Sequence, residues 1–303
     1  MNNKCIKSPL NYTGGKYKLL PQLLPLFPEK ISTFVDVFCG GANVGINVEA
    51  DKIIYNDSNA KLISLFKVFD KYSDEEIIKR ITKVIQRYGL SESKIYGYEH
   101  YGCNSSEGLG RYNRNAFDQL KSDFNARNRK DDYYYIMLYV LIVYGFNNQI
   151  RFNSKGEYNL PVGKRDFNRN IEKNLSLFVD SMHKQEKEFY SKDFSCLKNL
   201  ELGSDDFVYC DPPYLITTAS YNEMNGWTEN DEKLLLSYLD YLNSQNVKFA
   251  LSNVIEHKGR KNYLLIKWAE NYNIHYLDFD YSNSSYHGNN TDKETREVLI
   301  TNY

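Results

Sequence analysis

The stretch Thr33-Phe34-Val35-Asp36-Val37-Phe38-Cys39-Gly40-Gly41-Ala42 decides the fold class of this chain. Its first half is apolar and rich in β-branched and aromatic residues, which is typical of a buried strand. The two glycines that follow are typical of a tight turn out of a strand. We therefore expect a strand over TFVDVF and a helix that opens around Ala42.

The sequence on both sides of this stretch continues in βαβ order. KIIYND at residues 52–57 predicts a second strand, and a helix is expected near Asn59 to Phe69. The last third repeats the pattern, with a strand at DFVYC, a helix from about Glu229 to Leu242, a strand at VKFALS, and then IHYLDFDY and REVLITNY. This order predicts an α/β fold with a parallel or mostly parallel sheet.

Residues 71–184 interrupt this pattern with predominantly helical sequence. Helices are expected at residues 74–88, 112–124 and 132–144. Beyond them, QIRF and EYNL flank the turn-type residues Asn153 to Gly156, which predicts a β-hairpin carrying Arg151 and Lys155. We expect an α/β domain of residues 1–70 and 185–303, split by an inserted, mainly helical domain of residues 71–184.

Composition indicates a soluble globular protein and excludes several classes. The 303 residues are 25% charged and 42% hydrophobic, and five scattered cysteines form no CxxC pair, so neither a disulfide framework nor a metal site is expected. The N-terminus has no apolar signal segment, and the longest apolar stretch, Tyr133 to Phe146, is too short to span a bilayer and predicts a buried helix. We expect a cytoplasmic protein without a membrane partner.

The charge is unevenly distributed along the chain. The net charge is −1, which argues against indiscriminate binding to nucleic acid. Residues 111–170, however, hold eleven Lys or Arg against six Asp or Glu. Such a local surplus is either a footprint for phosphate or a variation of composition without function.

Asp211-Pro212-Pro213-Tyr214, directly after the apolar FVYC, is the sharpest functional signal. Two prolines end the strand abruptly and hold the chain rigid at the carboxyl end of the sheet, where open α/β sheets bind ligands. The Asp211 carboxylate and the Pro212 carbonyl would accept hydrogen bonds from an exocyclic amino group, and the Tyr214 ring would stack on a flat base. The alternative is an exposed proline-rich loop.

The glycine turn after the first strand favours a nucleotide site. Its glycines would let a ligand approach the backbone, and Asp57, about 20 positions on, stands where a ribose diol is commonly held. The turn is not GxGxxG, which argues against a nicotinamide cofactor. Near the N-terminus, NYTGGK at residues 11–16 is not a Walker A loop, so phosphate binding is not expected there, and closure over a cofactor is the alternative.

These motifs, in the order NYTGGK, DVFCGG, insertion, DPPY, resemble those of the Dam-like (alpha-class, D12) DNA adenine N6-methyltransferases. The resemblance covers nearly the whole chain and includes KDF at residues 192–194 and the tail EVLITNY. It implies a Rossmann-like sheet dependent on S-adenosylmethionine, with an inserted target-recognition domain. It also implies methyl transfer to the N6 amino group of an adenine flipped out of double-stranded DNA.

The resemblance also implies roles for individual residues of the cofactor and base sites. Tyr12 and Lys16 would border the methionine moiety, Asp57 the ribose hydroxyls, and Asp193 and Phe194 the cofactor adenine. The pocket would be completed by Asp36, Phe38, Gly40 and Asp211, and the target base would be held by Asp211, Pro212, Pro213 and Tyr214. The family often has glycine where Ala42 stands, so we expect altered packing there without loss of binding.

The segment FNNQIRFN at residues 146–153, followed by GEYNLPVG, resembles the target-recognition hairpin of the same family. By this resemblance Arg151 reads a guanine, for which a guanidinium fork is well matched, and Phe146 wedges into the duplex. The remaining expected DNA contacts are Asn147, Gln149, Asn153, Lys155, Pro161, Lys164 and Arg165, with Arg169 as a further phosphate contact. Gln149 is polar where relatives that read GATC tend to be apolar, so GATC is only one candidate site.

Several alternatives stay open at this stage. An N4-cytosine methyltransferase is the nearest rival, although such enzymes usually have Ser where this chain has Asp211. A catalytically inactive DNA-binding protein with the same fold is another. The sequence also leaves open whether a cognate restriction endonuclease acts on the same site, or whether this is an orphan or phage enzyme.

Overall fold

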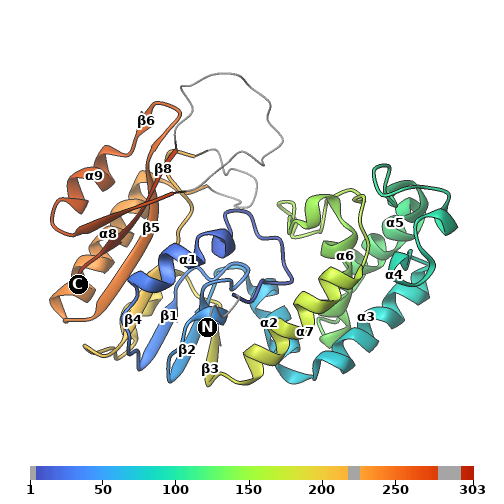
Figure 1. The fold of residues 1–303 in the computed structure, drawn as a ribbon, viewed down its shortest axis with the longest axis horizontal. Coiled ribbons are helices and arrows are strands. Elements are labelled where there is room, and N and C mark those ends of the chain that lie inside the picture. Colours follow the sequence, from blue (N-terminus) through green and yellow to red (C-terminus); the bar gives the residue numbers. More distant parts are fainter. Residues whose placement is uncertain (1–4, 218–225, 279–294) are drawn as a thin grey trace. The chain divides into compact units, whose positions relative to one another are not determined.

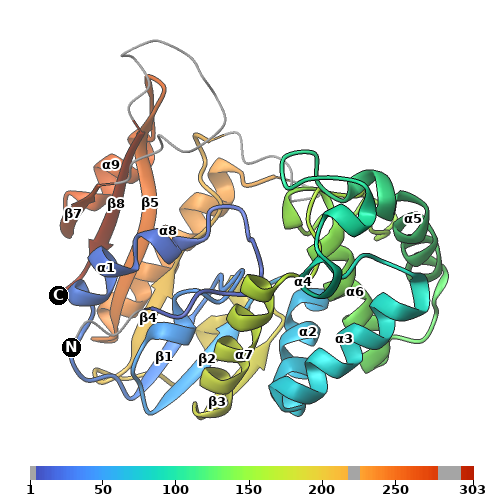
Figure 2. The ribbon, with the colours of Figure 1, turned by 45° about the vertical axis from the view of Figure 1, so that its right-hand side comes forward.

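A computed structural model describes residues 5–217, 226–278 and 295–303, and their contacts divide the chain into two compact units. Unit 1 comprises Met1–Gly15 and Asn59–Lys184, and unit 2 comprises Lys16–Ser58 and Gln185–Tyr303. The elements of both are labelled in Figure 1 and seen from a second side in Figure 2. Each unit is built from two segments of the chain.

Unit 2 contains one sheet with the strand order β3-β2-β1-β4-β5-β8-β7. The first five strands run parallel, and β8 pairs antiparallel with both β5 and β7. This confirms the predicted α/β class and the mostly parallel sheet. The strands are β1 (Thr33–Asp36), β2 (Lys52–Asn56), β3 (Lys187–Tyr190), β4 (Phe207–Cys210), β5 (Lys248–His257), β6 (Arg260–Lys261, paired with β5), β7 (Asn273–Leu277) and β8 (Thr295–Thr301).

Successive side chains of each strand point to opposite faces of this sheet, and both faces are buried. One face packs Val35 and Val208 against the leucines of α8 (Glu229–Ser244) and against α9 (Tyr263–Ala269). On the other face Phe27, which follows α1 (Leu20–Leu23) and the short 3-10 helix η2 (Leu24–Leu26), contacts the rings of Phe34 and Phe207. Both faces are covered, as strands of a parallel sheet require.

The prediction that a helix opens around Ala42 is wrong. Ala42 has a positive φ of 57°, a backbone conformation that an α-helix does not contain, and a single 3-10 turn, η3 (Gly45–Asn47), follows instead. The left-handed φ also explains why glycine suits this position. Two other short elements of unit 2, η1 (Lys16–Lys18) and η6 (Phe194–Asn199), lie beside predicted site residues.

Unit 1 is helical and is built around α6 (Asp132–Tyr144), whose side chains are buried on every side from Ile136 to Tyr144. The predicted buried helix is therefore confirmed. The other helices are α2 (Ala60–Lys71), α3 (Asp74–Tyr88), α4 (Ser93–Tyr96), η4 (Glu99–Tyr101), α5 (Gly110–Ala126), η5 (Phe146–Asn148) and α7 (Arg169–His183). No helix of the described residues is both long and apolar enough to cross a membrane.

The helical unit is larger than we expected: it begins after residue 58 and not after residue 70, and Met1–Gly15, which we expected in the α/β domain, also belongs to it. The cause of the earlier start is the packing of α2, whose Phe66 and Phe69 rings contact Phe178 of α7 and Tyr139 of α6 at 5.8 and 5.3 Å between centroids. These contacts group α2 with the inserted helices. The second boundary falls at residues 184 and 185, where the pattern change in the sequence indicated it.

The hairpin expected after α6 is present in reduced form. Its two arms meet at isolated antiparallel bridges, Gly145 with Val162 and Phe152 with Tyr158, and do not form continuous strands. Asn153 closes the turn, since its carbonyl accepts from the Gly156 amide at 2.8 Å and its side chain accepts from the Lys155 and Glu157 amides. The predicted turn chemistry at Asn153 to Gly156 is therefore confirmed.

Candidate functional site

Three acidic residues of unit 2 lie at the same edge of the sheet, because neighbouring parallel strands end there. Asp36 is the last residue of β1, Asp57 follows β2, and Asp211 follows β4, and these strands are adjacent in the order β2-β1-β4. The structure thus brings together three of the residues that the sequence indicated, from positions up to 175 residues apart.

The glycine turn is tied to the end of β2 by two hydrogen bonds. The Gly40 amide donates to Asp57 Oδ2 at 3.0 Å, and the Cys39 amide donates to the Asn56 carbonyl at 2.8 Å. Gly40 has a positive φ of 47°, which glycine adopts at little cost. The backbone of the turn and the Asp57 carboxylate therefore line the same place, as the nucleotide interpretation requires.

Asp36 is fully buried beside this turn and is held by the Gly45 amide, which donates to Asp36 Oδ2 at 3.2 Å. A Cβ atom at Gly45 would lie 2.5 Å from the Tyr55 ring, so only glycine allows this approach. Burial raises the pKa of Asp36 to about 8, with Asp211 and Asp57 adding to the rise and the Gly45 amide opposing it. Asp36 is thus mostly protonated at neutral pH.

Asn56 connects the ends of β1, β2 and the loop after β3. Its Nδ2 donates to the Val37 carbonyl at 2.9 Å and to the Lys192 carbonyl at 3.1 Å, and its Oδ1 accepts from the Lys192 amide at 3.0 Å. The next residue, Asp193, accepts from the Ser195 amide at 2.9 Å and so begins η6. The buried side-chain amide of Asn56 therefore fixes the loop that carries Asp193 and Phe194.

Three aromatic rings cluster next to the glycine turn. Phe38 and Phe194 lie 5.7 Å apart between ring centroids, and Trp227 lies 5.8 Å from Phe38 and 5.7 Å from Phe194. The Trp227 indole donates to Glu232 Oε2 at 2.6 Å, and Glu232 also accepts from the side chains of Asn253 and Asn262. Sequence reasoning missed Trp227, because nothing local in its flanking residues links it to a position nearly 190 residues earlier.

The Asp211 carboxylate is held from two sides. Lys16 Nζ lies 2.8 Å from Asp211 Oδ2, and the Tyr214 hydroxyl lies 3.0 Å from Asp211 Oδ1. Lys16 is buried and also lies 3.5 Å from Glu297 Oε1. Lys16 therefore has the Asp211 carboxylate of the DPPY segment as its ion-pair partner, a contact that the sequence did not reveal.

The electrostatics of this cluster follow from burial and from the ion pair. Burial alone would lower the pKa of Lys16, but Asp211 and Glu297 raise it on balance, so Lys16 stays charged. Burial raises the pKa of Asp211, and Lys16 opposes that rise. The pKa of Tyr214 lies well above its usual value because of burial and of the neighbouring Asp211 and Glu297, so its hydroxyl stays neutral and able to donate.

Glu297 is the second residue that sequence reasoning missed. It lies on β8, is 4% exposed, and its Oε1 is 3.0 Å from the Tyr214 hydroxyl. A carboxylate inside the apolar run of REVLITNY is the signal that was available, since a buried acidic residue needs a partner. Pro212 is buried and Pro213 is half-buried in the segment between Asp211 and Tyr214.

In unit 1 the predicted DNA-reading residues lie around the hairpin. Arg151 is half-buried, and its Nε and Nη2 donate to the side chain and carbonyl of Asn159 at 2.8 and 3.3 Å. Phe146 is 49% exposed in η5, and the carbonyl of Asn147 accepts from the Asn11 side chain at 2.8 Å. The side chain of Asn153 serves the turn, so its hydrogen bonds favour a structural role there.

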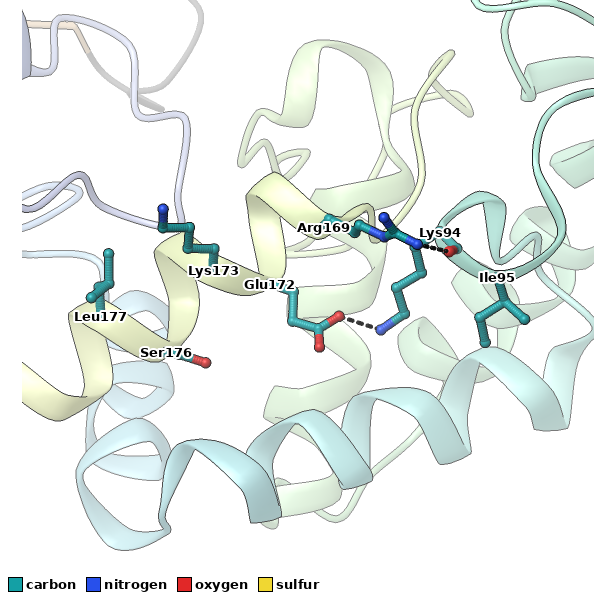
Figure 3. Close-up of a pocket in the computed structure, with 7 residues that line it drawn as sticks. All are labelled: Lys94, Ile95, Arg169, Glu172, Lys173, Ser176 and Leu177. Atoms are coloured by element: carbon teal, nitrogen blue, oxygen red, sulfur yellow. Dashed lines mark hydrogen bonds and ion pairs between the residues drawn. The ribbon is translucent and has the colours of Figure 1, made fainter.

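The other expected DNA contacts differ in exposure. Gln149 is half-buried, whereas exposed side chains are found at Lys155, Pro161, Lys164 and Arg165. Arg169 borders a groove of about 480 Å³ lined by Lys94, Ile95, Arg169, Glu172, Lys173, Ser176 and Leu177 (Figure 3). There it donates to the Lys94 carbonyl at 3.4 Å, while Lys94 and Glu172 form an ion pair.

Tyr12 belongs to unit 1, at the start of a turn in which the Gly15 amide donates to the Tyr12 carbonyl at 3.1 Å. Gly14 has a positive φ of 78° in this turn. The contact of Tyr12 with a cofactor stays a prediction. No group of three or more His, Cys, Asp or Glu side chains within residues 5–217, 226–278 and 295–303 is placed to hold a metal ion.

Comparison with known proteins shows which family the chain is similar to. The model of the family described as D12 class N6 adenine-specific DNA methyltransferase matches residues 12–283. The chain is 46% identical to Type II methyltransferase M.FokI of Planomicrobium okeanokoites and 43% identical to Modification methylase StsI of Streptococcus sanguinis, in both cases over 99% of this chain. It spans only 43% of the length of each of these two relatives.

A more distant relative matches over nearly its full length. The chain is 26% identical to DNA adenine methylase of Escherichia coli (strain K12) over 96% of this chain and 93% of that protein. The region matched by the family model, residues 12–283, contains the glycine turn, the helical insertion and DPPY.

Proposed function

Because the chain belongs to the D12 class N6 adenine-specific DNA methyltransferase family, we propose that it methylates the N6 amino group of an adenine in double-stranded DNA at one short sequence. The methyl donor in this proposal is S-adenosylmethionine. The observation that carries the proposal is the Asp211 carboxylate, held by Lys16 and Tyr214 at the carboxyl end of β4 next to the glycine turn.

The residues around the glycine turn suit an adenosyl cofactor. Phe38, Phe194 and Trp227 offer flat apolar surface for a purine ring, and Asp57 offers a carboxylate for a ribose diol. When bound, S-adenosylmethionine supplies an activated methyl group on a sulfonium. The chain itself contributes the pocket, and the Asn56 hydrogen bonds hold the loop of Phe194 in place.

The Asp211 site suits an exocyclic amino group. The lone pair of the adenine N6 is delocalised into the ring, so the nitrogen is a poor nucleophile. Hydrogen bonds from its two N–H groups to Asp211 and to the Pro212 carbonyl would favour a pyramidal nitrogen with a directed lone pair. Positioning and electrostatics of this kind carry the catalysis, without a covalent intermediate on the enzyme.

The target atom lies inside the duplex, so the base must leave the stack at a cost of a few kcal/mol. Stacking on an aromatic ring returns about 1–3 kcal/mol, and the Tyr214 ring is fixed for this by its hydroxyl contacts. Unit 1 is proposed to recognise the target, with Arg151 reading a guanine and the exposed Lys155, Lys164 and Arg165 contacting phosphates.

We also propose that the protein serves a restriction-modification system and protects a site from a cognate restriction endonuclease. The names of two relatives, a Type II methyltransferase and a modification methylase, support this context. DNA methylated by this protein is then expected to resist cleavage by that endonuclease.

The proposed reaction is tested by incubating the chain with unmethylated duplex DNA and S-adenosylmethionine carrying a deuterated methyl group, and by analysing the nucleosides by mass spectrometry. We expect labelled N6-methyldeoxyadenosine from the wild type. Asp211→Asn keeps the size of the side chain but removes its charge, so product is expected to fall more than about 100-fold while the cofactor still binds.

Two outcomes contradict the proposal. Labelled N4-methyldeoxycytidine would identify cytosine as the acceptor. Cofactor binding by the wild type without any labelled nucleoside would support a DNA-binding protein that has lost turnover.

A further inference from the structure

Glu297 places a second carboxylate in the Asp211 site, and the family match does not include it. The match ends at residue 283, whereas Glu297 lies on β8. Its neighbours Val298, Leu299 and Ile300 are fully buried, and Glu297 itself is 4% exposed. Apolar residues are the most stable choice at buried strand positions, because burying a charge costs free energy, so the acidic residue calls for an explanation.

The ion pair with Lys16 does not by itself explain a carboxylate at this position. Burying a carboxylate costs several kcal/mol, and an ion pair in the interior returns this cost only with good geometry. The Lys16 Nζ lies 3.5 Å from Glu297 but 2.8 Å from Asp211, so Asp211 is the better-placed partner of that charge. The shorter contact of Glu297 is with the Tyr214 hydroxyl, at 3.0 Å.

The Tyr214 hydroxyl has one hydrogen, but two carboxylates lie within hydrogen-bonding distance of it. It lies 3.0 Å from Asp211 Oδ1 and 3.0 Å from Glu297 Oε1, so it can donate to only one of them at a time. Burial and the two carboxylates keep this hydroxyl neutral, so the single hydrogen stays in place.

The choice between the two acceptors matters for Asp211. Lys16 already contacts Asp211 Oδ2, and a hydrogen bond from Tyr214 would take one of the two lone pairs of Oδ1. An amino group of a target base would then share Oδ1 with the Tyr214 hydroxyl, and Oδ1 would be a weaker acceptor for it. If the hydroxyl turns to Glu297, Oδ1 is released.

We propose that Glu297 is a positioning residue that accepts the Tyr214 hydroxyl and thereby leaves Asp211 Oδ1 to accept a hydrogen bond from the amino group of the target base. This inference rests on the proposed function, since it assigns a role within the same site. It concerns a residue that acts through Tyr214 and does not itself touch the base.

The test combines Glu297→Leu, Tyr214→Phe and the double variant in single-turnover methyl transfer to duplex DNA. Leucine removes the acceptor at similar volume, so we expect the rate to fall about 10- to 100-fold with unchanged cofactor affinity. Tyr214→Phe removes the competing hydroxyl but keeps the ring. In the double variant we therefore expect the rate to recover by at least about fivefold relative to Glu297→Leu, because Asp211 Oδ1 is again open.

A double variant as slow as Glu297→Leu, or slower, overturns the proposal, because a merely structural defect would not be relieved by a second substitution. If Glu297→Leu does not fold, Glu297→Gln takes its place. An amide oxygen is a weaker acceptor, so a smaller loss of rate with the same rescue is expected.

Glu256→Leu is the matched control on the adjacent strand β5, where Glu256 pairs with Arg296. Its rate is expected to equal that of the wild type. A wild type without transfer would refute the proposed function and is distinguished from failure of the rescue.

Discussion

At the scale of single residues, Asp36 shows how the fold sets a charge. It is buried with Asp57 and Asp211 nearby, and its pKa is raised to about 8 from the usual 3.8. Between these two pH values the folded state holds a proton that the unfolded state has lost. Stability from this residue is therefore lost as the pH rises from about 4 to about 8.

Asp36→Asn is expected to remove this pH dependence, because an amide cannot ionise and its oxygen can still accept from the Gly45 amide. The unfolding free energy of the variant relative to the wild type should rise across that window by up to about 5 kcal/mol and stay constant above about pH 8. Urea unfolding at several pH values measures this. Asp51→Asn, at an exposed position, is the control, and a constant difference between Asp36→Asn and the wild type from pH 5 to 8 would contradict an uncharged Asp36.

Residue by residue, the sequence predicted the parts of the site that lie in contiguous motifs. Asp36, Asp57 and Asp211 were found because each ends or follows an apolar strand, and parallel strands end at one edge. The ion pair of Lys16 with Asp211 and the contacts of Trp227 and Glu297 join positions far apart in the sequence. No local pattern contains such contacts, because they depend on how the strands order themselves in the sheet.

At the scale of elements, the ends of β1, β2 and β3 are joined by the Asn56 side chain. We expect Asn56→Ala to weaken binding of S-adenosylmethionine about tenfold, because two hydrogen bonds that hold the loop of Phe194 and one to the Val37 carbonyl are lost. Calorimetric titration measures the affinity, and thermal unfolding is expected to shift down by several degrees. Asn271→Ala, which removes an exposed hydrogen bond to the Trp268 carbonyl, is the control, and equal affinity in both variants would remove the role assigned to Asn56.

Most long helices were predictable from pattern, with α7 as the exception, and so were the short strands β1, β2 and β4, whereas the short helices were not. The bounds of α3 and α6 match the expectation because each has a capping residue, Ser73 and Asp131, before a long helical stretch. The strand β3 was not predicted, since its four residues KEFY have charged residues and no buried side chain. The prediction of a helix near Ala42 was wrong because Ala42 adopts a positive φ in that turn. Alanine rarely adopts such a conformation, so the sequence does not indicate it.

At the scale of the whole molecule, two units divide the proposed work. Unit 2, made of residues 16–58 and 185–303, contains the proposed cofactor and Asp211 sites, and unit 1 contains the hairpin of Arg151. We propose that transfer and target recognition are therefore separable. Arg151→Ala is expected to keep N6-adenine methylation but to relax the choice of base at one position of the site, since a bidentate contact to guanine contributes about 1–3 kcal/mol of discrimination.

The proposed reaction and the proposed target recognition are tested together by a map of modified bases in genomic DNA. The DNA is treated with S-adenosylmethionine and the wild type, Asp211→Asn or Arg151→Ala, and read by single-molecule sequencing. We expect N6-methyladenine at one short motif for the wild type, none for Asp211→Asn, and a motif degenerate at one position for Arg151→Ala. Methylated cytosine, or wild-type methylation that persists in Asp211→Asn, would contradict the proposed reaction.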